Sequence, residues 1–304
     1  MIEVAITPRS FRQTPGPHHD LLEKRSLKAR FPDSDAPLSA GALAAFVTGC
    51  PALIVGTDEV DAQVMDAGPL EIVVKYGTGM DNVDIGAARA RGVRVESTAG
   101  ANSRSVAELT LGLMLALARN IAWHDRGVRS GSWARHTGLE LEGKRLGIVG
   151  FGSVGRKVAR IARALGMEVI IHDPYVNAGI GHSSLREVLS NSDVVSLHLP
   201  LNDETRGVIG GDELALMKAG ALLVNTARGG LVDEEALAVA LEAGRLGGAA
   251  FDVFSTEPPG DSPLLHLENF IASPHTGAAT HEAIRRASLE AVEKVVALFA
   301  TEAQ

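Results

Sequence analysis

The most constraining feature of the chain is a glycine pattern that lies near its middle rather than at its start. Gly150, Gly152 and Gly155 have the spacing G-x-G-x-x-G, directly after the apolar run Leu146–Val149. Such a run is typical of a parallel strand that is buried on both faces. Glycines at these places allow a tight turn, a close approach of the backbone to a phosphate, and close packing of the next helix. The pattern predicts a strand, a phosphate-binding turn and the start of a helix.

The residues that follow complete a dinucleotide-binding unit. The predicted helix Val154–Leu165 would direct its N-terminal N–H groups at a pyrophosphate, and Gly166 would end it. Met167–His172 is predicted to be the second strand, and Asp173 stands at its end. A carboxylate there accepts hydrogen bonds from both ribose hydroxyls and repels a 2′-phosphate, so we expect NAD rather than NADP. The alternative is a glycine turn that binds nothing, and the flanking strand, helix and acid argue against it.

Charge and composition exclude several other classes of function. The chain has 29 Lys+Arg against 37 Asp+Glu, a formal net charge of −8, which argues against a general nucleic-acid or membrane-surface binder. Cys50 is the single cysteine, which excludes an internal disulfide framework and a cysteine-cluster metal site, and we expect no metal. The first residues lack the basic region of a secretory signal, and the longest apolar stretch, Leu109–Ala118, is too short to span a bilayer. A cytoplasmic protein is therefore expected.

Strand-like and helix-like segments alternate along the 304 residues, which favours two medium-sized domains with parallel sheets. A boundary is expected near residue 100. A short helix is expected around residues 20–29 and a strong one over 103–119, followed by a polar segment that reaches residue 142. The final amphipathic helix, residues 282–299, is expected to pack back onto the first domain.

Three polar residues follow predicted strands in the second half of the chain, where ligands of open α/β sheets bind. Each of the three also has an ordinary structural interpretation. Arg228 could form a salt bridge with Asp233 or Glu234. Glu257 could be a solvated loop acid, and His275 a hydrogen-bonded structural histidine.

Together, however, the three residues match one reaction. Reduction of a 2-keto acid needs a hydride donor, a cation for the substrate carboxylate and a proton donor for the carbonyl oxygen. NADH, Arg228 and His275 would fill these roles, because a guanidinium grips a carboxylate in a bidentate manner and histidine moves protons near neutral pH. Glu257 would orient His275 and raise its pKa.

The chain resembles the D-isomer-specific 2-hydroxyacid dehydrogenase family, and most of all its D-3-phosphoglycerate dehydrogenase branch. The resemblance covers about residues 70–285. Besides the glycine unit and Asp173, it is carried by Gly77–Asp84, Asn102–Glu108, His198–Pro200, Asn225–Gly230, Asp252–Pro258 and Ser273–Gly277.

The resemblance implies an α/β fold with two doubly wound parallel-sheet domains. A Rossmann cofactor domain, residues 100–282, would be inserted into a flavodoxin-like substrate domain formed by residues 1–99 and 283–304. It also implies a homodimer formed through the cofactor domains, with the segment 103–142 in the contact, and a small 2-hydroxy or 2-keto acid as the substrate.

The resemblance further implies the site residues. Arg228, Glu257 and His275 would be catalytic, and backbone N–H groups near Tyr76–Gly79 would receive the substrate carboxylate. The implied substrate-binding residues are Lys75, Tyr76, Gly77, Thr78, Gly79 and Arg228. The implied cofactor-binding residues are Thr78, Gly150, Gly152, Ser153, Val154, Gly155, Asp173, Leu199, Pro200, Thr205, Thr226, Ala227, Asp252 and Gly277.

Two departures from the branch leave the substrate open. An arginine that usually follows the strand Leu53–Val55 is replaced by Gly56, and Asp58 and Glu59 come next. An acid pair beside a phosphate is electrostatically unfavourable. Lys75 stands where the branch often has another arginine. Phosphoglycerate, glyoxylate or hydroxypyruvate, and larger keto acids remain alternatives, as does a non-enzymatic NAD-sensing co-repressor of the C-terminal binding protein type.

Overall fold

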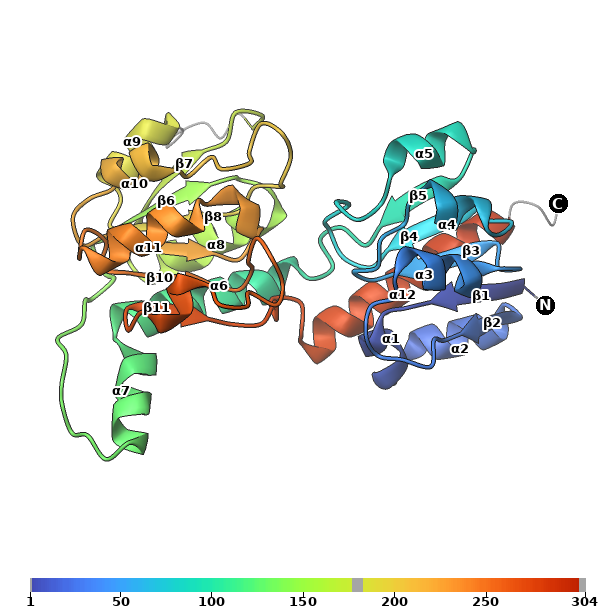
Figure 1. Ribbon diagram of the computed structural model, residues 1–304, viewed down its shortest axis with the longest axis horizontal. Coiled ribbons are helices and arrows are strands. Elements are labelled where there is room, and N and C mark those ends of the chain that lie inside the picture. Colours follow the sequence, from blue (N-terminus) through green and yellow to red (C-terminus); the bar gives the residue numbers. More distant parts are fainter. Residues whose placement is uncertain (1, 177–182, 301–304) are drawn as a thin grey trace. The chain divides into compact units, whose positions relative to one another are not determined.

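The computed structural model describes residues 2–176 and 183–300 and divides the chain into two α/β units (Figure 1). Unit 1 comprises Met1–Asn102 and Ala278–Gln304, and unit 2 comprises Ser103–Gly277. The boundaries fall at 102/103 and 277/278, where 99/100 and 282/283 were expected. The first lies immediately before α6 (Ser103–Ala118), whose buried side chains belong to the core of unit 2.

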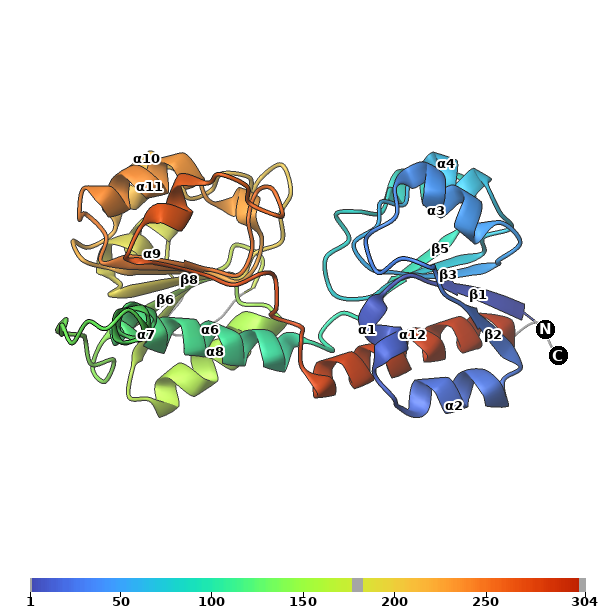
Figure 2. The same ribbon diagram turned by 60° about the horizontal axis from the view of Figure 1, so that its bottom comes forward.

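Unit 1 contains a five-stranded parallel sheet in the order β2-β1-β3-β4-β5. Its strands are β1 (Ile2–Ile6), β2 (Leu27–Arg30), β3 (Ala52–Val55), β4 (Ile72–Lys75) and β5 (Arg94–Ser97). One face is covered by α3 (Ala40–Val47), α4 (Ala62–Asp66) and α5 (Ile85–Ala90), and the other by α1 (Arg9–Gln13), α2 (Pro17–Lys24) and α12 (His281–Ala300) (Figure 2). The helix expected over residues 20–29 is wrong in its second half, because Leu27–Arg30 pairs with β1 as an edge strand.

Unit 2 contains a six-stranded parallel sheet in the order β11-β10-β9-β8-β6-β7. Its strands are β6 (Arg145–Val149), β7 (Glu168–His172), β8 (Val194–Leu197), β9 (Leu222–Asn225), β10 (Gly248–Phe251) and β11 (Phe270–Ala272). Helices α6 and α8 (Ser153–Ala164) cover one face, and α9 (Leu185–Asn191), α10 (Gly211–Leu216) and α11 (Glu234–Glu242) cover the other (Figure 2). Two 3₁₀ turns, η1 (Gly229–Leu231) and η2 (Pro263–His266), follow β9 and β10.

Both sheets are doubly wound, which confirms the predicted fold class. Strands β3, β4, β8, β9 and β10 are buried along their whole length, as parallel strands between two helical layers must be. In unit 2 the strand order reverses between β6 and β8. Ligands of such sheets bind beyond the carboxyl ends of the strands at this reversal. The topology therefore predicts a ligand site at the loop after β6.

A helical arm, residues 120–140, leaves unit 2 after α6. Asn120 has a φ of 51°, and the chain bends there into α7 (Ile121–Arg129), which has no buried residue (Figure 1). Within the described ranges, no single helix is long and apolar enough to cross a membrane; α6 and α7 reach the required length and hydropathy as a pair that is bent by 65°. Most of the apolar side chains of α6 lie in the core under the sheet.

Candidate active site

The three predicted catalytic residues follow three strands that lie side by side. Arg228 comes after β9, Glu257 after β10 and His275 after β11, and these strands are neighbours in the sheet of unit 2. Because the strands are parallel, their carboxyl ends meet at one edge.

His275 and Glu257 form a hydrogen-bonded pair. The distance from His275 Nδ1 to Glu257 Oε2 is 2.8 Å, and both side chains are partly exposed. Burial opposes the charged form of Glu257, but the hydrogen bond and charge of His275, the Phe254 N–H and the Arg228 guanidinium together hold the pKa of this carboxyl below its ordinary value. The carboxylate is therefore ionised near neutral pH and orients the ring, leaving Nε2 on the opposite side.

The loop that carries Arg228 is packed directly against the loop that leads to Glu257. A Cβ atom on Gly229 would lie 1.9 Å from the carbonyl carbon of Phe254, so no larger residue fits there without a movement of the main chain. Asn225, which is fully buried at the end of β9, donates from Nδ2 to the Arg228 carbonyl and accepts from the Ala227 N–H. The Arg228 guanidinium donates to the Ala227 carbonyl at 2.7 Å. Main-chain contact thus fixes Arg228 relative to Glu257.

Asp252 organises the loop that carries His275. Its carboxylate is 1% exposed and accepts hydrogen bonds from Ser273 Oγ at 2.6 Å, from Thr276 N at 2.8 Å and from Gly277 N at 2.7 Å. The His275 N–H donates to the Asp252 carbonyl at 2.8 Å, and His275 has a φ of 52°, in the left-handed region. These bonds hold a conformation that is unusual for a residue other than glycine.

Several supporting residues were not predicted from the sequence. Asn225 and Ser273 act through hydrogen bonds to loops, and the predicted role of Asp252 was contact with the cofactor. A signal was available, because buried strands that end in a polar residue usually present a side chain that caps the following loop.

The glycine loop after β6 has the local geometry that a pyrophosphate requires. A Cβ atom on Gly150, which has a φ of 97°, would lie 2.5 Å from the His198 carbonyl oxygen, and one on Gly155 would lie 2.2 Å from the Gly150 carbonyl oxygen. At Gly152 a Cβ would meet no protein atom within 4 Å, so this side of the turn is open. Helix α8 begins there with no side-chain cap. The N–H groups of its first turn are therefore directed at the open space, as in anion sites at helix N-termini.

Asp173 lies beside this loop at the end of β7. Its Oδ2 accepts from the Phe151 N–H at 2.7 Å and its Oδ1 from the Tyr175 N–H at 2.9 Å. The carboxylate is 8% exposed. A carboxylate oxygen can accept more than one hydrogen bond, so the loop and the acid fit the adenosine half of NAD.

The remaining residues of unit 2 that are predicted to bind the cofactor differ in their hydrogen bonds and packing. The hydroxyl of Thr205 donates to the Pro200 carbonyl at 2.7 Å, and that of Thr226 is 2.8 Å from the Thr110 hydroxyl in the interior. Leu199 and Ala227 pack against the core between β8 and α11. Ser153 Oγ accepts from Lys157 and Val154 packs against the core beneath α6, while Gly277 lies against Asp252.

The predicted substrate loop lies at the carboxyl edge of the sheet in unit 1. The Tyr76 N–H donates to the Val55 carbonyl and the Gly77 N–H to Thr98 Oγ1, both at 2.8 Å. The N–H groups of Tyr76 and Gly77 therefore already have acceptors within the protein. The prediction that backbone N–H groups receive the substrate carboxylate then applies to Thr78 and Gly79. The Thr78 hydroxyl, expected near the cofactor, donates to Asn102 Oδ1 at 3.4 Å.

Tyr76 and Lys75 point their side chains at protein partners. The Tyr76 hydroxyl donates to the Ile284 carbonyl and contacts Ser288 in α12, each at 3.0 Å. The ammonium group of Lys75 donates to the Gly56 carbonyl and is 8% exposed.

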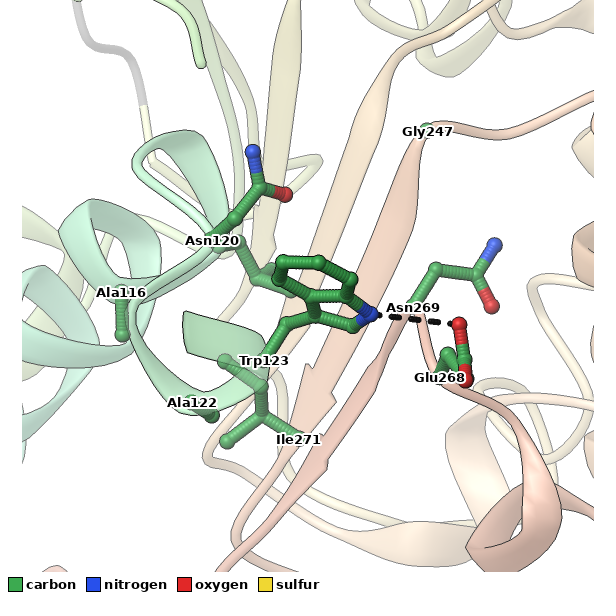
Figure 3. A pocket seen from close by; sticks show the side chains of 9 residues that line it. Ala116, Asn120, Ala122, Trp123, Gly247, Glu268, Asn269 and Ile271 are labelled. Carbon is green, nitrogen blue, oxygen red and sulfur yellow. Dashed lines mark hydrogen bonds between the residues drawn. The ribbon is translucent and has the colours of Figure 1, made fainter. Parts of the chain in front are cut away.

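A pocket that none of the predicted site residues lines lies in unit 2, at the base of the arm (Figure 3). The indole N–H of Trp123 donates to Glu268 at 3.2 Å, and the ring of His136 stacks on the indole at 3.7 Å. The bond to Glu268 fastens α7 to the loop before β11. Among the side chains in the described ranges there is no group of three or more His, Cys, Asp or Glu residues that could hold a metal ion.

Known proteins that are similar to this chain point to one family. Residues 111–277 match the family model described as "D-isomer specific 2-hydroxyacid dehydrogenase, NAD binding domain". The chain is 44% identical to a hydroxypyruvate reductase of Thermotoga maritima, over 78% of this chain and 80% of the relative. It is 43% identical to a D-3-phosphoglycerate dehydrogenase of Methanocaldococcus jannaschii, over 79% of this chain and 48% of the relative, so it spans about half the length of that protein.

Among solved structures, the TT0316 protein from Thermus thermophilus is similar over nearly the whole chain. The TM-score is 0.92 at 39% identity, with 99% of this chain and 97% of the other covered.

Proposed function

The chain belongs to the D-isomer specific 2-hydroxyacid dehydrogenase family, and we propose that it interconverts a D-2-hydroxy acid and its 2-keto acid by hydride transfer with NAD. The observation that carries this proposal is the 2.8 Å bond between His275 and Glu257 at the edge where Arg228 also emerges. A proton donor, its orienting carboxylate and a fixed cation are the protein groups that reduction of a 2-keto acid needs.

Each of the three residues has a defined task in the proposed reaction. When bound, NADH supplies the hydride. Arg228 holds the substrate carboxylate, since its guanidinium keeps its charge at every working pH. His275 Nε2 donates a proton to the carbonyl oxygen during reduction and takes it back during oxidation. The ionised Glu257 fixes the ring through Nδ1 and stabilises the imidazolium, and such proton transfer typically contributes about 10²–10⁴ in rate.

The carboxyl edge of unit 1 supports a proposal for the substrate class. A phosphoglycerate dehydrogenase-like activity is the first candidate because of the resemblance. However, Gly56 offers a carbonyl, which accepts from Lys75 and Asn82, where a phosphate would need a donor. The neighbouring Asp58 is 5% exposed and accepts from Thr7 and the Leu38 N–H. A buried acid close to Gly56 favours an unphosphorylated acid, so glyoxylate or hydroxypyruvate is the second candidate.

A screen of NADH oxidation tests this proposal. The purified chain would be assayed with glyoxylate, hydroxypyruvate, pyruvate, phosphohydroxypyruvate and branched 2-keto acids. We expect turnover with at least one, and a higher kcat/KM for hydroxypyruvate than for its phosphorylated form would support the second candidate over the first. Absence of turnover with every 2-keto acid would refute the enzymatic proposal, whereas a preference for the phosphorylated acid would refute the second candidate alone.

We also propose that the chain forms a homodimer through the arm. Four apolar side chains there are strongly exposed: Ile121 by 54%, Val128 by 56%, Trp133 by 76% and Leu139 by 45%. The Trp123 contacts keep the arm in a fixed position, and a second copy would bury this apolar surface.

A further inference from the structure

A side-chain link crosses the end of β6, where the glycine loop begins. The loop after β7 carries Tyr175, and the loop after β8 carries Glu204. Strands β7 and β8 flank β6 in the sheet, and the Tyr175 hydroxyl donates to the Glu204 carboxylate. Since the link joins the two outer loops, it bounds the space beyond the middle loop.

Both ends of the link are held by their own loops. The Tyr175 N–H donates to Asp173 Oδ1 at 2.9 Å, so the carboxylate expected at the ribose also fixes the backbone of the tyrosine. Glu204 sits in a turn in which Asn202 Oδ1 accepts from the Glu204 and Thr205 N–H groups, each at 3.0 Å. Such an Asx turn fixes the loop. The aromatic ring is therefore restrained although Tyr175 is 76% exposed.

The chemistry of the link suits a neutral, flat group with hydroxyls. The hydrogen bond to Glu204, with the charges of Glu204 and Asp173, raises the pKa of Tyr175, so its hydroxyl stays protonated and continues to donate. An exposed aromatic face is a stacking surface for a base, and carboxylates accept from ribose hydroxyls.

We propose that Tyr175 and Glu204 form the outer wall of the adenosine subsite and hold the adenosine half of NAD through their mutual hydrogen bond. The inference rests on the NAD site of the proposed function. It adds two binding residues beyond Asp173 and the glycine loop.

Calorimetric titration with ADP-ribose tests the link without any turnover. Tyr175→Phe removes the hydroxyl and keeps the ring, and Glu204→Ala removes the acceptor. We expect each variant to bind ADP-ribose roughly 3- to 10-fold more weakly, the loss typical of one partly exposed hydrogen bond to a charged group. The double variant should be no weaker than either single one, because both changes break the same bond. Glu235→Ala is the matched control, since Glu235 is an exposed acid on α11 and has no role in the proposed site.

A second ligand tests whether the effect of the link is confined to the adenosine half of NAD. Reduced nicotinamide mononucleotide lacks the adenosine, so the link variants should bind it as the parent does. Unchanged ADP-ribose affinity in both single variants, or equal weakening for the mononucleotide, would overturn the inference and leave the proposed function intact. Failure of the parent chain to bind ADP-ribose would overturn the NAD site and the inference with it.

Discussion

At the scale of single residues, a glycine fixes the catalytic geometry. Gly229 joins the Arg228 loop to the Phe254–Glu257 loop at a separation that leaves no room for a side chain. The relation between the cation and the carboxylate therefore depends on main-chain contact, which is stiffer than contact between side chains.

Gly229→Ala should lower kcat/KM by at least about 10²-fold and destabilise unit 2 by about 1–3 kcal/mol, the usual cost of overpacking. Gly230→Ala is the matched control, because its Cβ would meet the tips of the Leu201 side chain at 3.2 and 3.3 Å, and these can move. Steady-state kinetics and urea unfolding would measure both effects. Equal behaviour of the two variants would contradict this interpretation.

The sequence predicted the three catalytic residues better than the residues that hold their loops in place. Arg228, Glu257 and His275 could be selected because each follows a buried strand and each matches a step of one reaction. The roles of Asn225 and Ser273 depend on how three loops fold over one another. Contacts between residues more than twenty positions apart, such as Ser273 with Asp252, leave no periodic trace in a single sequence.

At the scale of elements, two glycines of the G-x-G-x-x-G motif serve different purposes, one for the fold and one for the ligand. Gly155 is needed for folding, because its Cβ would overlap the Gly150 carbonyl oxygen at 2.2 Å. A Cβ atom on Gly152 would meet no protein atom within 4 Å, so the fold does not require a glycine there and we expect the requirement to come from the ligand.

Gly152→Ala should keep the thermal midpoint within about 2 °C of the parent and weaken NADH binding at least about tenfold, because the added methyl occupies the place of the pyrophosphate. Gly155→Ala should lower both stability and affinity. Thermal unfolding and NADH fluorescence titration distinguish the two cases. Normal NADH affinity in Gly152→Ala would show that the pyrophosphate does not lie against this turn.

Elements with a strong apolar pattern were predicted, and short elements with charged residues were not. Strands β6 and β7 and helices α6, α8 and α12 agree with their expected ranges to within a few residues. Strand β2 was missed because Leu-Lys-Ala-Arg has high helix propensity, and its extended form depends on pairing with β1. Helix α7 has no buried residue, so it lacks the apolar pattern from which a helix is predicted.

At the scale of the whole molecule, acid sensitivity should come partly from His198. Burial lowers the pKa of His198 from 6.5 to about 3, and its Nε2 lies 3.0 Å from the hydroxyl of the fully buried Ser196. The unfolded chain therefore binds a proton at this residue below about pH 6.5, while the folded chain binds it only near pH 3. Stability is lost as the pH falls through this window.

Lowering the pH from 7 to 5 should reduce the free energy of unfolding by at most about 2 kcal/mol through His198. His198→Asn should lose less stability than the parent over the same range, with a residual slope from His18, whose pKa is also lowered by burial. Urea unfolding followed by circular dichroism at the two pH values gives the comparison. An identical loss in both proteins would show that His198 does not contribute.

The proposed dimer makes a prediction about mass. Light scattering should give twice the chain mass of 31.8 kDa, and Val128→Glu on α7 should give a monomer, because it would bury a charge in the interface. Val239→Glu on α11 is the matched control, since Val239 is 67% exposed on an element outside the arm. A monomeric parent at micromolar concentration would contradict the proposal.

The central claim is that His275 is the proton donor in a site that binds NADH independently of it. The most direct test compares kcat for the 2-keto acid and the Kd for NADH in the parent, in His275→Ala and in a control, His266→Ala, whose side chain is exposed on η2. We predict that His275→Ala lowers kcat by about 10²–10⁴-fold, leaves the Kd for NADH within about twofold, and that the control changes neither. Full turnover by His275→Ala would contradict the account.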